Sequence, residues 1–565
     1  MCGSYRFFFV WAAFRGHCES RGRSPMMNAA IEAWRTALGV EWVRDDVQTI
    51  ERYAQDTSDY ARQAVAIVVP SNTLQVQEVV RIASTYRVPI HPISTGRNWG
   101  YGTANPPRGG CAIVDLSRMC EIRAFDADLG LVTLEPGVTQ GALRAWMDER
   151  HLPFMVPTTG AGPGCSVVGN ALERGYGITP VADHFAAVTA LEAVLPDGSM
   201  YRSPMADKEG MGAFKWGVGP YLDGIFTQGH VGIVTSMTVA LARRPACVEA
   251  FYFWIDAESK LESAVEATRR LLQEAGANIG GINLMSAARV LAMSGRHRHA
   301  DDVANGSDAD AVALARRMGV APWMGIGAIY GTRFHARATR HVVRRTLDDV
   351  ARRIVFMTPA KAARLDRLAR CLPGARARRF AEMVDVMKQG LSLLEGVPGE
   401  VALPLAYRHA GAPPVHDRHP SRDGCGLLWY APIVPLRGKD ARRFVDLARG
   451  VCSRHGFDSP ITLTSVSERS FDCTLPLLFD RTDAGACKAA RECWDELLSV
   501  GRQSGFLPYR VHVRNTSSIV DETQGFWAVA GKIKAALDPL NILSPGRWES
   551  VAKRCRHTTH TIEME

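Results

Sequence analysis

Apolar and polar positions repeat with two different periods along the first half of the chain. Residues 64–70 are almost continuously apolar and predict a buried strand, whereas the spacing from Ser71 to Ile82 is typical of an amphipathic helix. Four later segments are expected to be strands, at 89–93, 112–116, 131–134 and 188–195, and one a helix, at 141–150. Because helices do not follow every strand, the pattern predicts an α+β domain and not a regular βαβ array.

The pattern changes near residue 245, where helical stretches rich in Ala, Arg and Leu separate short extended runs. The helices are expected at 260–275, 311–318 and 337–355, and the extended runs at 251–255 and 427–433. A proline-rich segment at 404–420 is expected to be a loop. We therefore predict a second α+β domain. A final helix over 523–537 leads into 538–547, which we expect to return to the first domain.

Composition excludes several classes of protein. With 565 residues, 46% of them apolar and 22% charged, the chain is typical of a soluble globular protein with at least two domains. No apolar run approaches the ~20 residues that cross a membrane. Thirteen cysteines without regular close pairs do not suggest a disulfide framework, and without Cys-x-x-Cys-His there is no covalently attached c-type haem. His297 and His299 could bind a metal, but we favour a polar loop and predict no metal.

Both ends of the chain are expected to lie outside these domains. Residues 7–14 are apolar but few, and the polar residues after them lack the small-residue cleavage pattern of a signal peptide. We therefore expect residues 1–26 to be a poorly ordered extension and 551–565 to be a tail. Without a clear signal, the sequence leaves the compartment open between cytoplasm and periplasm.

Arginine is concentrated between Arg333 and Arg379, although the net charge of +9 is modest for this length. One interpretation is a docking face for an acidic protein or a nucleic acid. The other is the solvated face of amphipathic helices. No nucleic-acid motif accompanies the arginines, so we favour the second interpretation and predict no nucleic-acid partner.

A glycine-rich loop in residues 89–104 is a candidate anion site. A short apolar run there ends in a segment that contains Gly96, Gly100 and Gly102. Glycine permits positive φ and close approach, and clustered backbone N–H groups form a concave site that suits a pyrophosphate. The alternative is a plain turn between strands. No Gly-x-Gly-x-x-Gly lies between a strand and a helix, so a Rossmann fold is not expected.

Four segments in order resemble a known family. They are 93–101, 160–180 followed by Asp183-His184-Phe185, 219–228 followed by 232–235, and 538–547. Together they are similar to the flavoprotein family of vanillyl-alcohol oxidase and p-cresol methylhydroxylase, over residues 28–549. The likeness at 157–163 and 172–177 favours the side of the family that holds the flavoprotein subunits of 4-cresol dehydrogenase and eugenol hydroxylase.

The resemblance implies an α+β fold with a two-part FAD-binding domain of the p-cresol methylhydroxylase type and an α+β cap over the substrate. The implied boundaries are 27–244 and 506–550 for the two parts of the FAD domain, and 245–505 for the cap. The first loop would hold the FAD pyrophosphate, and Arg547 would stabilise the anionic reduced ring. The implied FAD-binding residues are Ser94, Thr95, Gly96, Arg97, Asn98, Gly100, Gly162, Gly164, Ser166, Gly169, Asn170, Gly232, Ile233, Val234 and Arg547.

The resemblance also implies oxidation of a para-alkylphenol such as p-cresol, 4-ethylphenol or eugenol. A hydride passes from the benzylic carbon of the phenolate to flavin N5, and the resulting p-quinone methide adds water. Tyr101, Tyr509 and Arg510 match the residues that stabilise the phenolate, because two O–H donors and a guanidinium lower the pKa of a phenol. Neighbours on a strand point to opposite faces, so Tyr509 and Arg510 require a twist or bulge to converge.

Glu173 matches a carboxylate that assists proton transfer and guides water near the flavin. The alternative interpretation is a structural one, in which Glu173 pairs with Arg174 or caps a helix. A family resemblance therefore implies a catalytic set of Tyr101, Glu173, Tyr509 and Arg510.

The attachment of FAD is left open by the sequence. The oxidase branch uses a histidine where this chain has Gly426, so a histidyl link is not expected there. The methylhydroxylase branch uses a tyrosine, and Tyr407 is the nearest candidate, with His416 and His419 as alternatives. Asn98 replaces the histidine of berberine-bridge-type relatives, which excludes a link from that loop.

The electron acceptor implied by the resemblance is a small cytochrome c. It must be a separate chain because no haem motif is present, and the implied assembly is a homodimer or a heterotetramer with that cytochrome. The arginine-rich helices are a candidate docking face. The alternatives are an oxidase that uses dioxygen, and an FAD-binding protein that has lost catalysis; the four catalytic residues argue against the latter.

Overall fold

A computed structural model describes residues 24–293, 317–371, 374–411, 413–415, 417–521 and 523–550. Several expectations lie outside the described residues: most of the N-terminal extension, the tail, most of the helix expected at 311–318, and His297, His299 and His416. The extension was expected to reach residue 26, but Ser24 caps helix α2 (Pro25–Leu38), so residues 24–26 belong to that helix.

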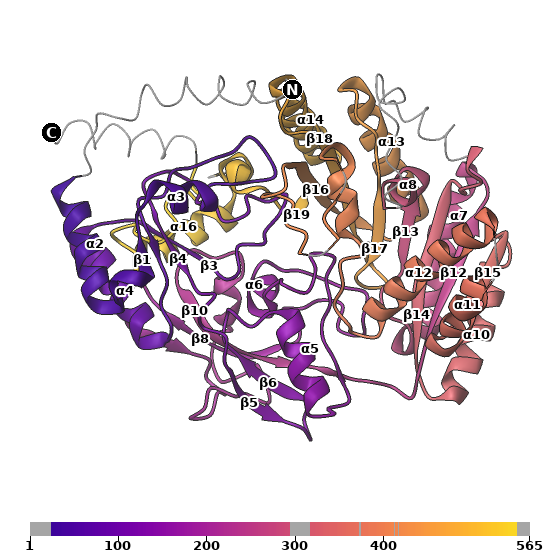
Figure 1. The fold of residues 1–565 in the computed structure, drawn as a ribbon, viewed down its shortest axis with the longest axis horizontal. Coiled ribbons are helices and arrows are strands. Elements are labelled where there is room, and N and C mark those ends of the chain that lie inside the picture. Colours follow the sequence, from indigo (N-terminus) through magenta and orange to yellow (C-terminus); the bar gives the residue numbers. More distant parts are fainter. Residues whose placement is uncertain are drawn as a thin grey trace.

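A four-stranded sheet forms the first layer of the indigo part of Figure 1. Its strands, in spatial order, are β1 (Val43–Arg44), β2 (Ile67–Val68), β4 (Ala112–Asp115) and β3 (Ile90–Ile93). Helix α4 (Thr73–Tyr86) packs against α2, and the buried Trp34 indole donates to Val79 O at 3.1 Å. The helix expected from Ser71 begins at Thr73, and its cap is Asn72, whose side chain accepts from the Gln75 N–H.

A five-stranded antiparallel sheet follows. Its strands, in spatial order, are β5 (Ile122–Asp126), β6 (Leu131–Leu134), β10 (Ile233–Ala240), β8 (Val188–Val194) and β9 (Met200–Arg202). Strands β6 and β8 are buried on both faces, including the polar residues Thr133 and Glu192. Helices α5 (Gln140–Glu149) and α6 (Val167–Leu172) pack with this sheet in one core cluster.

The second half of the chain builds an antiparallel sheet of eight strands. In spatial order they are β15 (Arg353–Met357), β12 (Cys247–Ile255), β14 (Trp323–Gly331), β13 (Asn283–Ser286), β17 (Thr462–Ser465), β18 (Ser470–Asp480), β16 (Cys425–Pro435) and β19 (Pro508–Arg510). Both faces are buried, as β12 illustrates. Phe251 and Phe253 enter one core cluster, whereas Ala250 and Tyr252 enter another, as the period of two for a strand requires.

Helices cover this sheet and complete the second unit. They are α7 (Leu261–Ala275), α10 (Arg333–Leu347), α11 (Pro359–Cys371), α12 (Ala375–Leu394), α13 (Gly438–Arg454) and α14 (Ala484–Gln503). The helix expected over 337–355 was wrong in its second half, because Arg353 pairs with Trp254 and starts a strand. The loop expected from residue 404 instead begins as a 3₁₀ helix, Leu403–His409. The sheets and segregated helices confirm the predicted α+β class.

The C-terminal segment lies among the first elements of the chain. Helix α16 (Gly525–Leu537), yellow in Figure 1, sits beside the indigo and purple strands. The Ile90 N–H donates to Ile542 O at 2.7 Å, and the Ser544 N–H donates back to Ile90 O at 2.8 Å. This return brings Arg547 to the loop that follows β3. No described helix has the length and apolarity needed to span a bilayer.

Candidate active site

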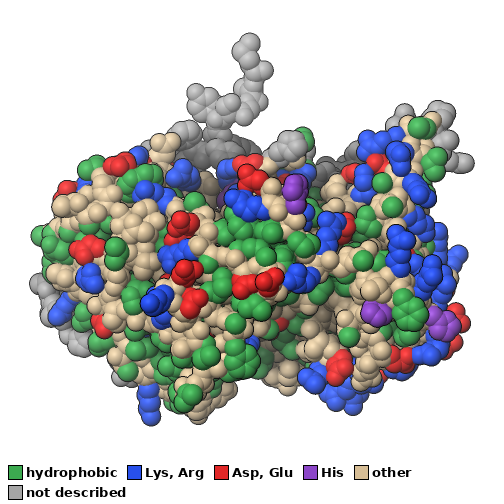
Figure 2. Space-filling view, turned by 90° about the horizontal axis from the view of Figure 1, so that it is seen from below, with side chains coloured by type: hydrophobic (Ala, Val, Ile, Leu, Met, Phe, Trp, Pro, Cys, Tyr) green, Lys and Arg blue, Asp and Glu red, His purple; other side chains and the backbone are tan. Residues whose placement is uncertain are grey.

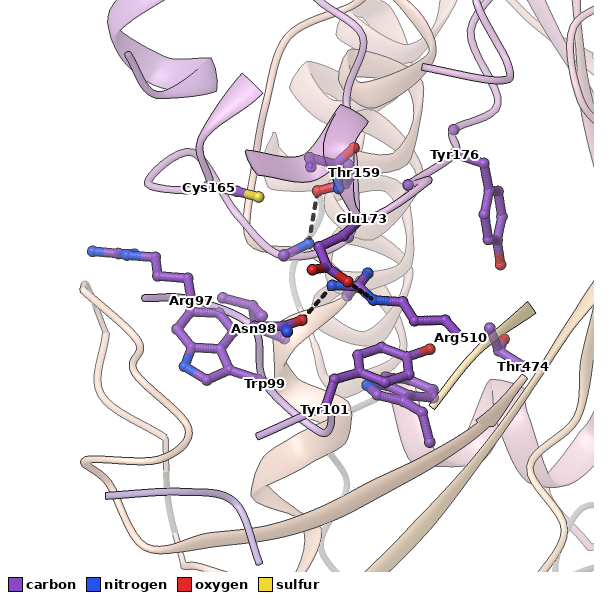
Figure 3. A pocket seen from close by; sticks show the side chains of 18 of the residues that line it. Arg97, Asn98, Trp99, Tyr101, Thr159, Cys165, Glu173, Tyr176, Thr474 and Arg510 are labelled. Atoms are coloured by element: carbon purple, nitrogen blue, oxygen red, sulfur yellow. Dashed lines mark hydrogen bonds and ion pairs between the residues drawn. The ribbon is translucent and has the colours of Figure 1, made fainter. Parts of the chain in front are cut away.

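One large cavity lies where the two halves of the molecule and the C-terminal segment meet. Its volume is about 1040 Å³, and it is lined by the loop after β3, the region around α6, strands of the eight-stranded sheet and Arg547. Figure 3 shows Arg510 extended between Glu173 and Tyr101 within it. The cavity exceeds the usual range for one drug-sized ligand, so it has room for a large cofactor together with a small substrate.

The glycine-rich loop after β3 presents unused backbone donors to this cavity. The N–H groups of Thr95, Gly96, Arg97 and Asn98 donate to no other group in the described part of the chain, and Gly96 has a φ of +63°. Ser94 also lines the cavity. Consecutive free amides at a positive-φ turn form an anion site, so the geometry fits a pyrophosphate.

Gly100 departs from the expected role. Its N–H donates to Thr57 Oγ1 at 2.9 Å, so it is not available to a phosphate. Its φ is +78°, and a Cβ there would lie 2.2 Å from Cδ1 of Trp429. The residue is glycine because the loop packs against that indole, which fixes the position of the next residue, Tyr101.

The second glycine-rich segment packs against the first and lines part of the same cavity. Ser166 caps α6: its Oγ accepts from the Gly169 N–H at 2.9 Å and donates to Pro136 O at 2.6 Å. Gly164 allows the Arg97 guanidinium to approach, since a Cβ there would lie 2.3 Å from its Cζ. Of the residues expected in this segment, Ser166, Gly169 and Asn170 line the cavity, and Gly162 and Gly164 do not.

The start of β10 supplies another close backbone approach. Gly232, Ile233 and Val234 all line the cavity. A Cβ on Gly232 would lie 2.6 Å from Cε1 of Phe226, so only glycine permits this backbone position.

Tyr101, Tyr509 and Arg510 come together, although Tyr101 is more than 400 residues away in sequence. The Arg510 guanidinium carbon lies 4.3 Å from the Tyr101 ring centroid, and both side chains influence the pKa of Tyr509. Tyr176 joins them, with its ring centroid 6.1 Å from that of Tyr509. Burial raises the pKa of all three tyrosines, so each stays a neutral O–H donor.

A bulge makes Tyr509 and Arg510 converge. Strand β19 pairs with β16, and its register shifts between Ala431, opposite Arg510, and Pro432, opposite Pro508. This shift is the irregularity that the adjacent Tyr-Arg pair requires, because a regular strand would direct the two side chains to opposite faces. Both line the cavity.

Glu173 joins two arginines from distant parts of the chain. Its Oε1 accepts from Arg547 Nη2 at 2.8 Å, and its Oε2 lies 3.5 Å from Arg510 Nε. Burial alone raises the pKa of Glu173, but the charges of Arg547 and Arg510 outweigh it and lower that pKa to about 2. The side chain is therefore ionised at neutral pH. Arg174 instead bonds to Thr227, so an Arg174 partner for Glu173 is ruled out.

Asp472 was missed as a site residue by the sequence reasoning. It is buried on β18, two residues before the cavity-lining Thr474, and its Oδ1 has no hydrogen-bond partner among the described residues. Burial raises its pKa well above the usual value, partly offset by Arg510. Asp472 does not itself line the cavity, but its charge contributes to the raised pKa of Tyr101, Tyr176 and Tyr509. Its alternation with Thr474 along the strand is the sequence signal that could have suggested it.

Arg289 was also missed. It is 9% exposed in helix α8 (Ala287–Met293), lines the cavity, and its guanidinium carbon lies 5.6 Å from the Trp429 ring centroid. A single arginine in an apolar helix carries no sequence pattern that distinguishes it, so only the fold could identify it.

Tyr407 does not reach the cavity. It is 1% exposed, and its hydroxyl donates to Asp423 Oδ2 at 2.6 Å. His419 does not line the cavity either, and its Nδ1 accepts from Ser421 and the Arg422 N–H. The geometry gives no support to a covalent link from either side chain.

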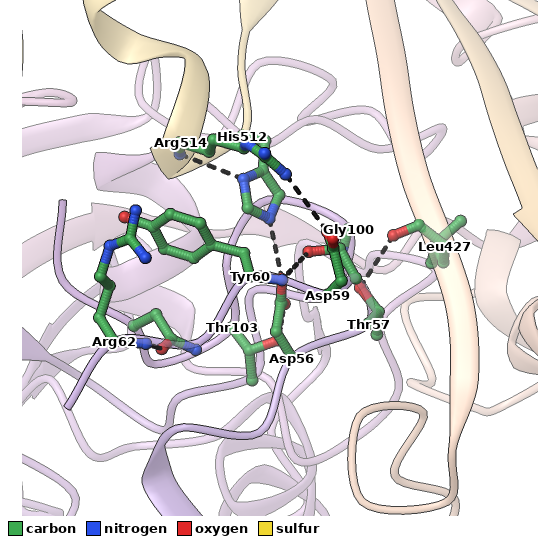
Figure 4. Close-up of polar contacts among 12 residues, drawn as sticks. Asp56, Thr57, Asp59, Tyr60, Arg62, Gly100, Thr103, Leu427, His512 and Arg514 are labelled. Carbon is green, nitrogen blue, oxygen red and sulfur yellow. Dashed lines mark hydrogen bonds and ion pairs between the residues drawn. The ribbon is translucent and has the colours of Figure 1, made fainter. Parts of the chain in front are cut away.

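A buried network connects the segments that carry Tyr101 and Arg510 (Figure 4). The Asp56 carboxylate accepts from His512 Nε2 at 2.9 Å, from Ser58 Oγ at 2.6 Å and from Thr103 Oγ1 at 2.7 Å. The Arg514 N–H donates to His512 Nδ1, so the proton of the ring lies on Nε2. His512 is two residues after Arg510, and Thr103 two after Tyr101, so this network ties together the two segments that carry them.

These features fit FAD. The free amides of residues 95–98 suit its pyrophosphate, the glycine backbone of β10 suits close stacking, and the Arg547–Glu173–Arg510 group supplies charge at the opposite end. Among the described residues, no group of three or more His, Cys, Asp and Glu side chains could hold a metal ion.

Comparison with known proteins agrees with this geometry. A family model described as "FAD binding domain" matches residues 64–203. The chain is 33% identical over 533 residues to the 1'-carboxy-chondrochloren decarboxylase of Chondromyces crocatus, covering 93% of this chain and 97% of that protein. It is 29% identical to the 4-cresol dehydrogenase [hydroxylating] flavoprotein subunit of Pseudomonas putida, covering 92% and 95%.

A solved structure has the same architecture. Substrate-bound p-cresol methylhydroxylase superposes with a TM-score of 0.81 at 27% sequence identity, covering 94% of this chain and 98% of that chain. The cofactor is FAD, and the enzyme is an FAD-dependent oxidoreductase. The chain thus belongs to the vanillyl-alcohol oxidase and p-cresol methylhydroxylase family of flavoproteins.

Proposed function

We propose that this enzyme oxidises a para-alkylphenol at its benzylic carbon. The observation that carries the proposal is the convergence of Tyr101, Tyr509 and Arg510 in one buried corner of the cavity. Two neutral O–H donors beside a fixed guanidinium stabilise a phenolate, because each donates a charge-assisted hydrogen bond to its oxygen. A protein that only carried FAD would not need this set.

The reaction begins with ionisation of the phenol. Arg510 and the two tyrosine hydroxyls hold the phenolate oxygen, whose electron density assists loss of a hydride from the benzylic carbon. FAD, when bound, accepts that hydride. The neutral p-quinone methide then takes up water: the water oxygen bonds to the benzylic carbon, a proton is released, and the ring regains its phenolate form. Burial strengthens each of these electrostatic contacts.

Glu173 is proposed to act on the water and on the two arginines. Ionised at neutral pH, it accepts a hydrogen bond from the attacking water while it holds Arg510 and Arg547 apart at fixed positions. Arg547 is proposed to place its positive charge beside the reduced flavin ring. The sets at 94–98, 166–170 and 232–234 are proposed to bind FAD, and the two sheets of the first half with the C-terminal segment to form its domain.

A separate electron acceptor, a cytochrome c subunit, is proposed. The Pseudomonas relative is named a flavoprotein subunit, which supports a partner chain for this protein in a heterotetramer. The exposed arginines of α10 and its neighbours are the proposed docking face, visible as basic side chains along the right-hand edge of Figure 2. Dioxygen as the acceptor, in a homodimer, is the alternative.

A second fate of the quinone methide is loss of carbon dioxide. The Chondromyces relative is named a decarboxylase, and the unpaired Arg289 in this cavity favours a carboxylated substrate. If a carboxylate stands on the carbon next to the benzylic one, its C–C bond breaks, the electron pair forms a C=C bond, and the ring oxygen becomes phenolate again. Both fates share the same oxidation step.

The test is anaerobic addition of 4-ethylphenol to the purified, flavin-loaded protein. Bleaching of the main flavin band supports the proposal, and its absence with a panel of para-alkylphenols overturns it. Re-oxidation of the reduced flavin by air, or only by added cytochrome c, then distinguishes the two electron acceptors. In a separate sample, acid precipitation shows whether FAD is covalently attached, because attached flavin leaves the protein pellet yellow.

A further inference from the structure

Among the residues that the structure describes, Arg289 is a buried cation without a counter-charge. The four other arginines that line the cavity each face a carboxylate: Arg510 and Arg547 lie beside Glu173, Arg418 is 3.2 Å from Glu400, and Arg97 is 3.8 Å from Asp417. Arg289 forms no salt bridge in the described part of the chain, and its Nε and Nη1 have no hydrogen-bond partner there.

Such an arrangement is costly in the absence of a ligand. Burying an unpaired charge costs several kcal/mol, so buried cations are normally paired or bind an anion. Burial lowers the pKa of Arg289 to about 10, with Tyr176 acting in the opposite direction, and the guanidinium therefore stays charged at neutral pH. Its aromatic neighbour Trp429 offsets only part of the cost.

Other buried polar groups without hydrogen-bond partners also line the cavity. Asn283 Oδ1 and Thr462 Oγ1 are buried without partners among the described residues, and both residues line the cavity. Asn283 lies on β13, directly before helix α8, and its register partner on β17 is Thr464. Thr462 is two residues before Thr464 on that strand. The Arg289 guanidinium and the Thr462 hydroxyl are thus two buried donors that line the cavity without partners among the described residues, whereas Asn283 Oδ1 can only accept a hydrogen bond.

Arg289 lies near the residues proposed to bind the phenolate. Trp429, next to Arg289, packs on Gly100, and Tyr101 follows directly in the chain. Tyr176, the titratable group that acts on Arg289, lies beside Tyr509. One small molecule can therefore contact the phenolate-binding residues with its ring oxygen and Arg289 with a second group.

We propose that Arg289, with the Thr462 hydroxyl as a second donor, binds a carboxylate of the phenolic substrate, so that the preferred substrates are para-substituted phenols that carry a carboxylate. The inference rests on the proposed function and adds that the phenolic substrate also carries a carboxylate. A planar guanidinium matches a carboxylate in geometry and charge. The anion could also come from an FAD phosphate, and the experiment distinguishes these two sources.

The experiment compares 3-(4-hydroxyphenyl)propanoate with its primary amide, which has the same shape without the charge. Equilibrium binding to the flavin-loaded protein is followed by the change in the flavin spectrum, and flavin reduction is measured anaerobically. The wild-type protein is expected to bind the carboxylate about 10- to 100-fold more tightly than the amide. Equal or weaker binding of the carboxylate overturns the inference.

Arg289→Met is expected to remove this preference by weakening binding of the carboxylate while binding of the amide stays within about twofold. Arg289→Lys keeps the charge and is expected to restore part of the preference, which separates a charge effect from a folding defect. A preference that survives in Arg289→Met overturns the inference. Loss of FAD from Arg289→Met also overturns it, since the anion would then belong to the cofactor.

The two proposals fail in different ways. Reduction by 4-ethylphenol and by the amide, without preference for the carboxylate, refutes the Arg289 inference alone. Preferential binding of the carboxylate without flavin reduction by any phenol supports an anion site at Arg289 and refutes the proposed oxidation.

Discussion

The guanidinium of Arg547 donates from Nη2 to Oε1 of Glu173 at 2.8 Å, across 374 residues of sequence. The other oxygen of Glu173 faces Arg510, the residue beside Tyr509. A single carboxylate therefore connects the C-terminal segment, the loop after α6 and the strand that carries the proposed phenolate site. Several consequences of this arrangement are measurable.

Replacing Tyr509 by Phe removes one of the two O–H donors proposed for the phenolate. Hydride transfer is expected to fall by about 10²- to 10³-fold, as when one donor of an oxyanion site is lost, while the FAD content stays unchanged. Anaerobic stopped-flow reduction by 4-ethylphenol measures the effect. Unchanged turnover would contradict the phenolate assignment.

Glu173 gives the stability a defined pH dependence. Its pKa is lowered from 4.5 to about 2, so its ion pairs stabilise the fold above about pH 4.5 and this contribution disappears as the pH falls towards 2. The contribution at neutral pH is about 3 kcal/mol. Urea unfolding of wild type and Glu173→Gln should differ by about this amount near neutrality and by much less in acid; an equal difference at both would refute the assignment.

The Asp56–His512 pair is expected to be structurally essential. Asp56→Asn removes a buried carboxylate that accepts hydrogen bonds from His512, Ser58 and Thr103, and should cost about 1.5–3 kcal/mol of unfolding free energy. Asp59→Asn is the matched control, because Asp59 pairs with Arg514 and Arg491 on the surface and its loss should cost about 1 kcal/mol or less. Equal losses in the two variants would contradict the role of the network.

Gly100 should tolerate no side chain. Gly100→Ala places a Cβ 2.2 Å from the Trp429 ring at a φ of +78°, and is expected to destabilise the protein by about 2–4 kcal/mol and to displace Tyr101. Gly110→Ala is the control: its φ is +83°, with open space around the new Cβ, so only backbone strain of about 1 kcal/mol is added. Similar melting temperatures of the two variants would contradict the packing argument.

Tyr407→Phe should leave the attachment of the flavin unchanged. The Tyr407 hydroxyl is bonded to Asp423 and lies outside the cavity. After acid precipitation, the share of flavin in the pellet is expected to be equal for the variant and the wild type. A yellow pellet from wild type and a colourless one from the variant would show that Tyr407 is the link.

Local patterns in the sequence predicted much of the secondary structure. Strands at residues 90–93 and 131–134 are observed as expected because their apolar runs are short and bounded by turn residues. The helix expected over 337–355 failed where Arg353 pairs with Trp254 in a sheet, since strand pairing over 99 residues outweighed local helical preference. The ordered segments around Ile93, Gly160 and Asp538 were sufficient to indicate the family and its cofactor.

The sequence by itself determined the α+β class, and it indicated a candidate anion-binding loop after residue 93 and Tyr101, Glu173, Tyr509 and Arg510 as residues to test. Only the tertiary structure decided that Gly100 packs against Trp429, that Tyr407 lies outside the cavity, and that Arg289 lines it. The reason is physical: a loop or strand motif is encoded by neighbouring residues, whereas burial, pairing and pKa depend on side chains that meet only after the chain has folded.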